Sequence, residues 1–337
     1  MAVATSDLSR RVEAAFQAVI PDSVDVELRT GPDPRAHDFE ATISGRLLRV
    51  EWLSHAWLSA VGRILARPDP PDIIVGQRVS PASRKALAQA GIGWVETSGD
   101  AEIATDFLVV SRTGGRRPAR EGNGGWTPAV IGVAEAVLAG VKPTVSATHE
   151  ATGLSVGACT KALRVLTDMH HLEAEASRGP RSGRQVTDRD ALLDAYVAAV
   201  HGMESSGSLS VGVIWRDPVD GLVELGARWD EAAVPWVATG LVAAAVVAPL
   251  ATSVGTADVY VVGSTVAELE AAASAVGLRP IEGGRLVLSP LPTQATLALS
   301  TVVDGLRVAA WPRLVADLRR SGVRGEEAAE RVKVSRG

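Results

Sequence analysis

The sequence predicts a multidomain α/β protein in which a central, mainly helical unit separates two α/β domains. The chain has 337 residues, which is more than a single hydrophobic core usually supports. Strand patterns alternate with helix patterns before residue 111 and again after residue 205. Residues 111–125 are rich in Gly and Arg and lack apolar periodicity, as is typical of a linker. We therefore expect domains at residues 1–111, 126–204 and 205–337, and a linker at residues 112–125.

The composition indicates an ordinary globular protein, because 46% of the residues are apolar and 22% are charged. A single cysteine, Cys159, excludes an intrachain disulfide and fits a reducing cytoplasm, so we expect a cytoplasmic protein. Cys159 lies on the apolar side of a helical pattern and has no His or Asp partner in a nucleophile motif. It is therefore expected to be a core residue. The first residues predict an amphipathic helix and lack the order of a signal peptide.

Two further properties limit the possible partners. Residues 236–255 approach membrane-spanning length, but they are Ala-rich and are interrupted by Pro249, which favours a buried helix over a membrane span. The formal net charge of -5 excludes a generally basic, charge-coated nucleic-acid binder. It permits a local basic patch.

The first domain is predicted to start with a helix, followed by a hairpin at residues 38–53 that turns at Ser44 and Gly45. A helix is expected at residues 54–66 from the spacing of its apolar residues, and a strand at 71–79. The next helix has Ser80 as its N-cap and Gly91 as its C-cap. Strands are expected at 92–99 and 103–111. Strands and helices in this order predict an α/β layer domain.

The helical unit is predicted to contain helices at 127–140, 144–153 and 155–170, two strands around Gly179 and Pro180, and a helix at 188–200. Thr127 is expected to cap the first of these helices and Ser155 the third. This order is that of a winged helix-turn-helix. In the third helix, Cys159, Leu163 and Leu166 recur at i, i+4 and i+7 and should be buried. The expected function of the opposite face is DNA binding.

The predicted DNA-binding residues lie on this third helix and on the wing. Small residues at the start of the helix allow the backbone to approach the major groove, and longer polar and basic side chains reach phosphates and base edges. Arginines set among glycine and proline suit a wing tip that touches the phosphate backbone or the minor groove. These residues are Ser155, Gly157, Ala158, Thr160, Lys161 and Arg164 on the helix, and Arg178, Arg181 and Arg184 on the wing. The alternative interpretation is a helical bundle with a solvated basic loop.

The linker contains a further group of basic residues. Arg112, Arg116, Arg117 and Arg120 can add phosphate contacts, and a solvated flexible linker explains them equally well.

The third domain is predicted to mix strands at 210–215, 257–263, 284–289 and 306–311 with helices at 234–250, 264–277 and 313–322. Its residues 261–270 contain a Gly-Ser turn similar to the one that opens nucleotidyltransferase sites. No Asp-x-Asp pair follows, and Glu268 and Glu270 fall on the predicted helix. We therefore interpret this turn as structural.

Two acids in the first domain, Asp38 and Glu51, fall on neighbouring predicted strands. Restriction-type nucleases place an acid at a strand start and Glu-x-Lys on the next strand, so that the carboxylates hold Mg²⁺ and the lysine orients water. Here the lysine position is Leu53, which can do neither. We expect a degenerate nuclease-like domain of the PD-(D/E)XK type, with no catalytic residue and no metal. A plain hairpin with exposed acids is the alternative, and His55 is expected to begin the next helix.

Most of the chain resembles long actinobacterial regulators related to AbiEi-family antitoxins of type IV toxin-antitoxin systems. The matching pieces are residues 71–103 in the first domain, 151–166 and 183–200 in the helical unit, and 236–249 and 306–333 in the third domain. The chain departs from the family pattern at Asp100, where Asn is usual, at His170 and His171, where a Gly is common, and at Cys159, where Val is common.

The resemblance implies a DNA-binding repressor or antitoxin whose first domain has a nuclease-like fold. We therefore expect a sequence-specific regulator of double-stranded DNA, with no enzymatic activity, no cofactor and no membrane attachment. It is expected to be a homodimer, with a cognate toxin as a possible protein partner. The alternatives are a metal-dependent DNA nuclease that uses Asp38 and Glu51, and an interaction protein that neutralises a toxin.

Overall fold

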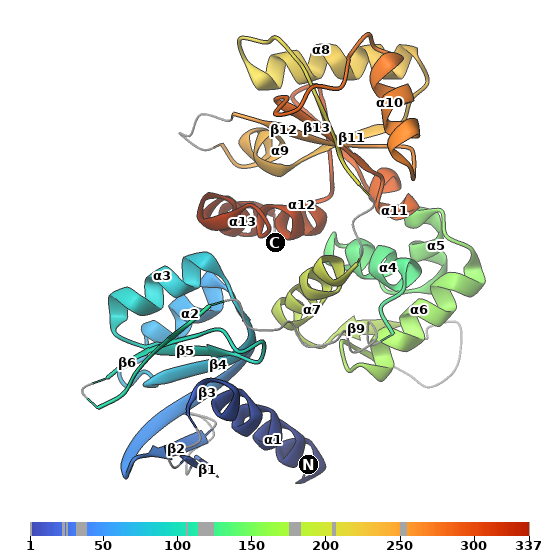
Figure 1. Cartoon of the computed structure of the whole chain (residues 1–337). Coiled ribbons are helices and arrows are strands. Elements are labelled where there is room, and N and C mark those ends of the chain that lie inside the picture. The colour runs from blue at the N-terminus through green and yellow to red at the C-terminus, as the bar shows by residue number, and fades with distance from the viewer. Residues whose placement is uncertain are drawn as a thin grey trace. The chain divides into compact units, whose positions relative to one another are not determined.

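A computed structural model of the chain describes residues 2–21, 24, 26–31, 39–105, 107–113, 125–174, 183–203, 207–249 and 255–336 (Figure 1). It shows a mixed α/β protein with two main mixed sheets, of seven and six strands, and thirteen helices over the described residues. The chain forms two compact units, residues 1–121 and 122–337. The division lies inside the predicted linker. The second unit contains both the helical region, residues 125–203, and the C-terminal sheet.

The first unit is built on the seven-stranded sheet, whose strands are neighbours in chain order. The outer pairs are antiparallel, and β3, β4 and β5 run parallel. The strands are β1 (Val26–Thr30), β2 (Phe39–Ile43), β3 (Arg46–Ala56), β4 (Ile73–Val79), β5 (Gly93–Glu96), β6 (Ala101–Ala104) and β7 (Val109–Arg112).

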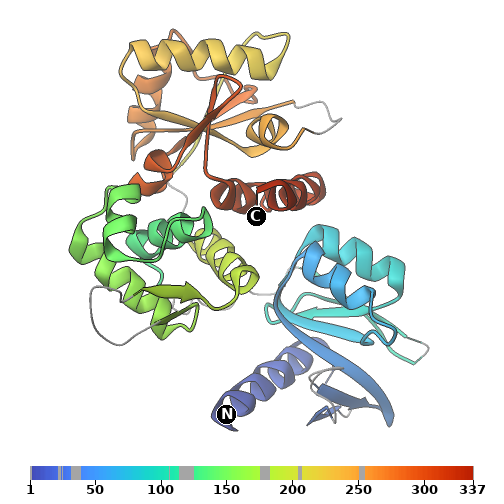
Figure 2. The ribbon, with the colours of Figure 1, turned by 180° about the vertical axis from the view of Figure 1, so that it is seen from behind.

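Helices cover both faces of this sheet (Figures 1 and 2). On one face α1 (Ala2–Val19) packs Phe16 against Ile73 and other apolar residues. On the other face α2 (Leu58–Leu65) and α3 (Pro81–Ala90) pack against Ile74 and Trp94. Successive strand residues point to opposite faces, so the continuous apolar run of β4 supplies both cores.

Several predicted turns and caps of the first unit are confirmed. Ser44 and Gly45 both have positive φ, 51° and 75°, as a two-residue hairpin turn between β2 and β3 requires. The Ser80 side chain accepts a hydrogen bond from the Ser83 amide, and Gly91 ends α3 with φ of 70°.

Other predictions for the first unit were wrong. The helix expected from residue 54 starts at Leu58, because β3 continues its parallel pairing with β4 as far as Ala56. His55 therefore lies in a strand, opposite Arg78, and does not begin the helix. The strand expected at 103–111 is two antiparallel strands, β6 and β7. Strand β1 was not predicted.

The helical region contains α4 (Pro128–Leu138), α5 (Val145–Thr152), α6 (Val156–Asp168) and α7 (Arg189–Gly202). Two short strands, β8 (Leu172–Ala174) and β9 (Arg184–Val186), form an antiparallel pair between α6 and α7. The predicted order of three helices, two strands and a helix is therefore present. The caps expected at Thr127 and Ser155 are confirmed, since each side chain accepts a hydrogen bond from a backbone amide of the first turn.

The C-terminal sheet has the strand order β10-β13-β12-β11-β15-β14. Helices α8 and α10 lie on one side of it, and α9, α12 and α13 lie on the other (Figures 1 and 2). The strands are β10 (Leu209–Val211), β11 (Trp236–Thr239), β12 (Ala257–Val261), β13 (Leu286–Pro290), β14 (Thr301–Val303) and β15 (Leu306–Val308). The helices are α8 (Pro218–Glu231), α9 (Gly240–Val247), α10 (Val266–Ser274), α11 (Gln294–Ala298), α12 (Trp311–Leu318) and α13 (Gly322–Arg336).

The helix expected at residues 234–250 was only partly correct. Its first part is β11, which is buried on both faces between β12 and β15, and only Gly240–Val247 form the helix α9. An apolar run of this kind suits a central strand as well as a buried helix. Helices α8, α11 and α13 and strand β14 were not predicted. Among the described residues, no helix has the length and apolar character needed to cross a membrane.

Candidate nucleic-acid interface

Helix α4 forms the centre of the helical region. All nine of its residues from Val130 to Leu138 are buried, because α5, α6, α7 and α11 pack around it. Because α4 is packed on all sides, it holds the helices around it in defined positions.

Helix α6 packs one side on α4 and exposes the other. Cys159, Leu163 and Leu166 are fully buried, as their spacing predicts. Lys161 and Arg164 are exposed on the opposite side. Within the described part of the chain neither head group makes a hydrogen bond or an ion pair.

The start of α6 is small and open. Ser155 caps the helix by accepting a hydrogen bond from the Ala158 amide at 3.2 Å. A Cβ atom added at Gly157 would meet no atom within 4 Å, so this first turn can approach another surface closely. The Thr160 hydroxyl donates to the Val156 carbonyl at 2.8 Å, so towards a ligand its oxygen can act as an acceptor. Ala158 is half-buried.

The turn between α5 and α6 depends on a glycine and on a side-chain hydrogen bond. Gly153 ends α5 in the left-handed region, with φ of 67°. The exposed His149 donates from Nδ1 to the Leu154 carbonyl at 2.6 Å, so Nε2 is the ring nitrogen that takes no part in this hydrogen bond. Sequence reasoning missed His149 because its role depends on the turn geometry. It also missed the exposed Lys142, just before the Thr144 cap of α5.

The two strands after α6 correspond to the base of the predicted wing. They pair from Leu172 opposite Val186 to Ala174 opposite Arg184. Arg184 is half-buried, and its Nε donates to the Thr167 hydroxyl of α6 at 3.2 Å, so it ties the strands to the helix. Arg178 and Arg181, predicted at the wing tip, lie outside the described residues.

The turn after α6 contains an unusual backbone conformation. His170 has φ of 61°, in the left-handed region that favours glycine. Burial and the neighbouring His170 charge lower the pKa of His171, whose ring lies 6.0 Å from that of Trp126. A glycine at position 170 would adopt this backbone conformation without strain.

Among the linker arginines only Arg112 is described. Its guanidinium donates to the Ala18 carbonyl at the end of α1 at 2.5 Å, so it has a structural contact in the first unit. Arg116, Arg117 and Arg120 lie outside the described residues.

The acidic pair of the first unit does not have the surroundings of a nuclease site. Glu51 is buried on β3 and forms an ion pair with Arg67 at 2.8 Å, so it is not the exposed acid of the alternative interpretation either. Leu53, at the lysine position, packs in the apolar cluster beneath α2 and α3. Asp38 lies outside the described residues. His55 stacks on Trp57, with ring centroids 5.8 Å apart.

The Glu96–Asp100 turn of the first unit is organised by Glu96. This buried carboxylate accepts hydrogen bonds from the Val79 amide at 2.8 Å, from Arg84 at 2.6 Å and from the Ser98 hydroxyl at 3.0 Å. Arg84 also lies 4.2 Å above the Trp94 ring. The turn therefore joins β4, β5 and α3, which is a structural role.

The Gly-Ser turn of the C-terminal sheet closes on its own helix. The Glu268 carboxylate accepts from the amides of Ser264 and Thr265 at 2.6 and 3.0 Å, and Thr265 completes a capping box. The amides that would face a phosphate are thus occupied. Among the described residues, no group of three or more His, Cys, Asp and Glu side chains is placed to hold a metal ion.

A pocket of about 220 Å³ lies between α7, α12 and α13. Its two cations are already engaged: Arg189 donates to the Leu138 carbonyl at 2.7 Å and lies over the Trp311 ring, and Lys333 pairs with Asp190 at 2.7 Å. The exposed basic face of α6 is therefore the better candidate site.

No protein-family model matches the sequence, and no curated protein and no solved structure matches it either.

Proposed function

We propose that the protein is a sequence-specific regulator of transcription that binds double-stranded DNA through a winged helix-turn-helix. In this proposal α4, α5 and α6 are the three helices, β8 and β9 are the base of the wing, and α6 is the reading helix. The observation that carries the proposal is the division of α6 into a fully buried apolar side and an opposite side with two exposed cations that have no partner among the described residues.

The charges of the reading helix suit a duplex. Lys161 and Arg164 are three residues apart, so their side chains project from one side of the helix. Both can reach phosphates, and arginine can also form two hydrogen bonds to a guanine edge. The small residues at Ser155 and Gly157 permit a close approach of the helix start to the groove. Because the whole chain carries a net charge of -5, most of its surface repels DNA, which favours binding through this face.

The first unit is proposed to be a nuclease-like domain without nuclease activity. The supporting observations are the packing of the partly buried Leu53 against an apolar cluster and the neutralisation of Glu51 by Arg67. Contact with a partner, dimerisation or additional contacts to the DNA backbone are the roles left to it. The resemblance to AbiEi-type antitoxins favours a repressor or antitoxin, with a cognate toxin as a protein partner.

We further propose a homodimer. One winged helix covers a short half-site, and useful specificity generally takes two half-sites about 10 bp apart. Light scattering that finds a monomer, both free and on its specific duplex, would count against the dimer.

The test of DNA binding is a fluorescence-anisotropy titration at several salt concentrations. Lys161→Ala and Arg164→Ala should each weaken binding to the specific duplex by about 1–3 kcal/mol where a base contact is lost. Arg178→Ala and Arg181→Ala should weaken binding to all sequences alike and lower the salt slope by about one unit each.

The matched control is the double variant Lys85→Ala/Arg331→Ala, which removes two exposed cations from other elements. It should bind as the wild type does. Circular dichroism reports whether each variant is folded. A folded Lys161→Ala/Arg164→Ala protein that binds like the control would exclude α6 as the reading helix.

A further inference from the structure

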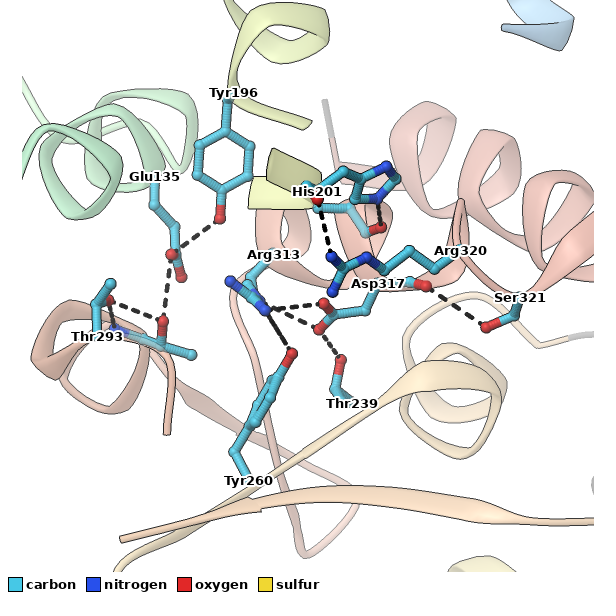
Figure 3. A network of polar contacts seen from close by, with 12 residues as sticks. Glu135, Tyr196, His201, Thr239, Tyr260, Thr293, Arg313, Asp317, Arg320 and Ser321 are labelled. Atoms are coloured by element: carbon cyan, nitrogen blue, oxygen red, sulfur yellow. Dashed lines mark hydrogen bonds and ion pairs between the residues drawn. The ribbon is translucent and has the colours of Figure 1, made fainter. Parts of the chain in front are cut away.

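A buried carboxylate joins the reading unit, which is the helical region of residues 125–203, to helix α11 beside the C-terminal sheet (Figure 3). Glu135 of α4 accepts hydrogen bonds on Oε2 from the hydroxyls of Tyr196 of α7, at 3.0 Å, and Thr296 of α11, at 3.3 Å. The residue is fully buried. Its second oxygen, Oε1, has no hydrogen-bond partner among the described residues. The Glu135 side chain thus connects α4 with α7 and α11, while one of its two carboxylate oxygens lacks a hydrogen bond among the described residues.

The surrounding network contains more acid than base. From α12, Arg313 and Asp317 face Glu135, and they pair with each other at 3.1 Å. Arg313 also donates to the Tyr260 hydroxyl of β12, and the Thr239 hydroxyl of β11 donates to Asp317 at 2.6 Å.

The guanidinium of Arg313 is already paired with Asp317. Asp258 of β12 adds another mostly buried carboxyl, whose charge interacts with that of Asp317. His201 of α7 lies at the same junction and contacts the Ala316 carbonyl at 2.7 Å. An ionised Glu135 is therefore an excess negative charge in a buried place, which is unfavourable. Consistent with this, burial raises the pKa of Glu135 to about 7.

Helix α11, which supplies Thr296, also touches the reading unit at two glycines. A Cβ atom at Gly132 of α4 would lie 2.7 Å from the Cβ of Ala295. A Cβ atom at Gly153, in the turn before α6, would lie 2.9 Å from the side-chain nitrogen of Gln294. The helix that hydrogen-bonds Glu135 therefore also rests against the turn that sets the position of α6.

We propose that Glu135 is a positioning residue whose proton controls the docking of α11 against the α5–α6 turn, and through that turn the binding of DNA by α6. The proposal rests on the proposed DNA binding. Protonated Glu135 removes the excess charge, and α11 stays docked. Ionised Glu135 favours an arrangement in which α11 separates from α4 and water reaches the carboxylate.

The direction of the pH dependence follows from the linkage between proton binding and docking. The docked state binds the proton more tightly than an open state in which the carboxyl is hydrated. Docking is therefore favoured at low pH and is lost as the pH rises through about 7. With an open-state pKa near 4.5, the docking equilibrium should fall about tenfold between pH 6 and pH 8.

The experiment compares the full-length wild type with Glu135→Gln, whose amide oxygen still accepts both hydrogen bonds but carries no charge at any pH. Two quantities are measured from pH 6 to pH 8: the Kd for a duplex that the wild type selects from a random-sequence pool, and the hydrogen-exchange protection factors of α11 and the α5–α6 turn in the free protein. A protection factor is the intrinsic exchange rate at that pH divided by the observed rate, so the general rise of exchange with pH cancels. The wild type should bind up to about tenfold more weakly and have lower protection factors at pH 8. Glu135→Gln should show neither change. The control Glu224→Gln, an exposed position on α8, should behave like the wild type.

A pH dependence of the protection factors that is the same in Glu135→Gln and the wild type would overturn the proposal. The exchange measurement needs no DNA. If the wild type bound no duplex, the proposed function would fail, while the proton-dependent docking would still be supported or contradicted by exchange. If Glu135→Gln did not fold, Tyr196→Phe serves instead. It removes a donor that lowers the pKa of Glu135, so the transition should move to higher pH, and an unchanged midpoint would contradict the proposal.

Discussion

A tight contact between α4 of the reading unit and α11 gives a quantitative prediction. Gly132 lies in the middle of α4, and a Cβ atom there would be 2.7 Å from the Cβ of Ala295 on α11. Two methyl carbons in contact are normally about 3.5–4 Å apart, so Gly132→Ala forces the two helices apart. Neither atom is on a flexible side chain that can rotate away.

The magnitude follows from two opposing terms. Alanine in a helix interior gains about 1 kcal/mol over glycine, whereas overpacking a tight contact costs about 1–3 kcal/mol. The difference lets us expect Gly132→Ala to lower the free energy of unfolding of the second unit by up to about 2 kcal/mol. Gly157→Ala in α6 is the matched control, because a Cβ atom there meets nothing within 4 Å. It should raise the free energy of unfolding by up to about 1 kcal/mol.

The assay is urea unfolding followed by circular dichroism, with midpoint and slope fitted together. The reasoning also predicts a coupling between the two positions: Ala295→Gly should cost less stability in Gly132→Ala than in the wild type, because in Gly132→Ala it also removes the clashing carbon. If Gly132→Ala were as stable as Gly157→Ala, or if Ala295→Gly cost the same in both backgrounds, the packing of α11 on α4 would not be as described.

Three other predictions concern single residues. The protein should not cleave DNA in Mg²⁺ or Mn²⁺, because Leu53 packs against an apolar core and Glu51 pairs with Arg67; metal-dependent cutting that disappears in Glu51→Ala would refute this. His170→Gly should raise the free energy of unfolding by up to about 1 kcal/mol by relieving the positive φ, and an unchanged or lower value in thermal unfolding would contradict it. Burial and then Asp317 raise the pKa of Asp258 to about 6, so its contribution to stability is present below about pH 4 and is lost as the pH rises to about 6. Asp258→Asn should lack this decrease, of about 1–3 kcal/mol, and a variant with the wild-type pH profile of unfolding would argue against it.

The features that the sequence predicted well are local ones. The hairpin turn at Ser44 and Gly45, the cap of α3 at Ser80 and the cap of α6 at Ser155 each depend on two to four consecutive residues. The buried face of α6 depends on helical spacing alone, and the structure places Leu163 and Cys159 there. Such signals need no knowledge of the rest of the chain.

The features that it missed depend on distant partners. Strand β11 has the same apolar composition as a buried helix, and only its pairing with β12 and β15 decides between them. The hydrogen bond between Glu135 and Thr296 joins residues 161 positions apart, so no local pattern reveals it. His55 was placed in a helix because the apolar spacing after it is helical, whereas its pairing with Arg78 keeps it in β3.

The most direct test of the central claim is selection of duplexes from a random-sequence pool by the full-length protein, followed by sequencing. The proposal predicts enrichment of a defined motif, with two half-sites about 10 bp apart if the protein is a dimer. Arg164→Ala should bind the same motif with relaxed preference at one position of each half-site, and the control Lys85→Ala/Arg331→Ala should select the wild-type motif unchanged. No enrichment by the folded wild type, or an identical motif at equal affinity from Lys161→Ala/Arg164→Ala, would contradict the proposal that α6 reads DNA.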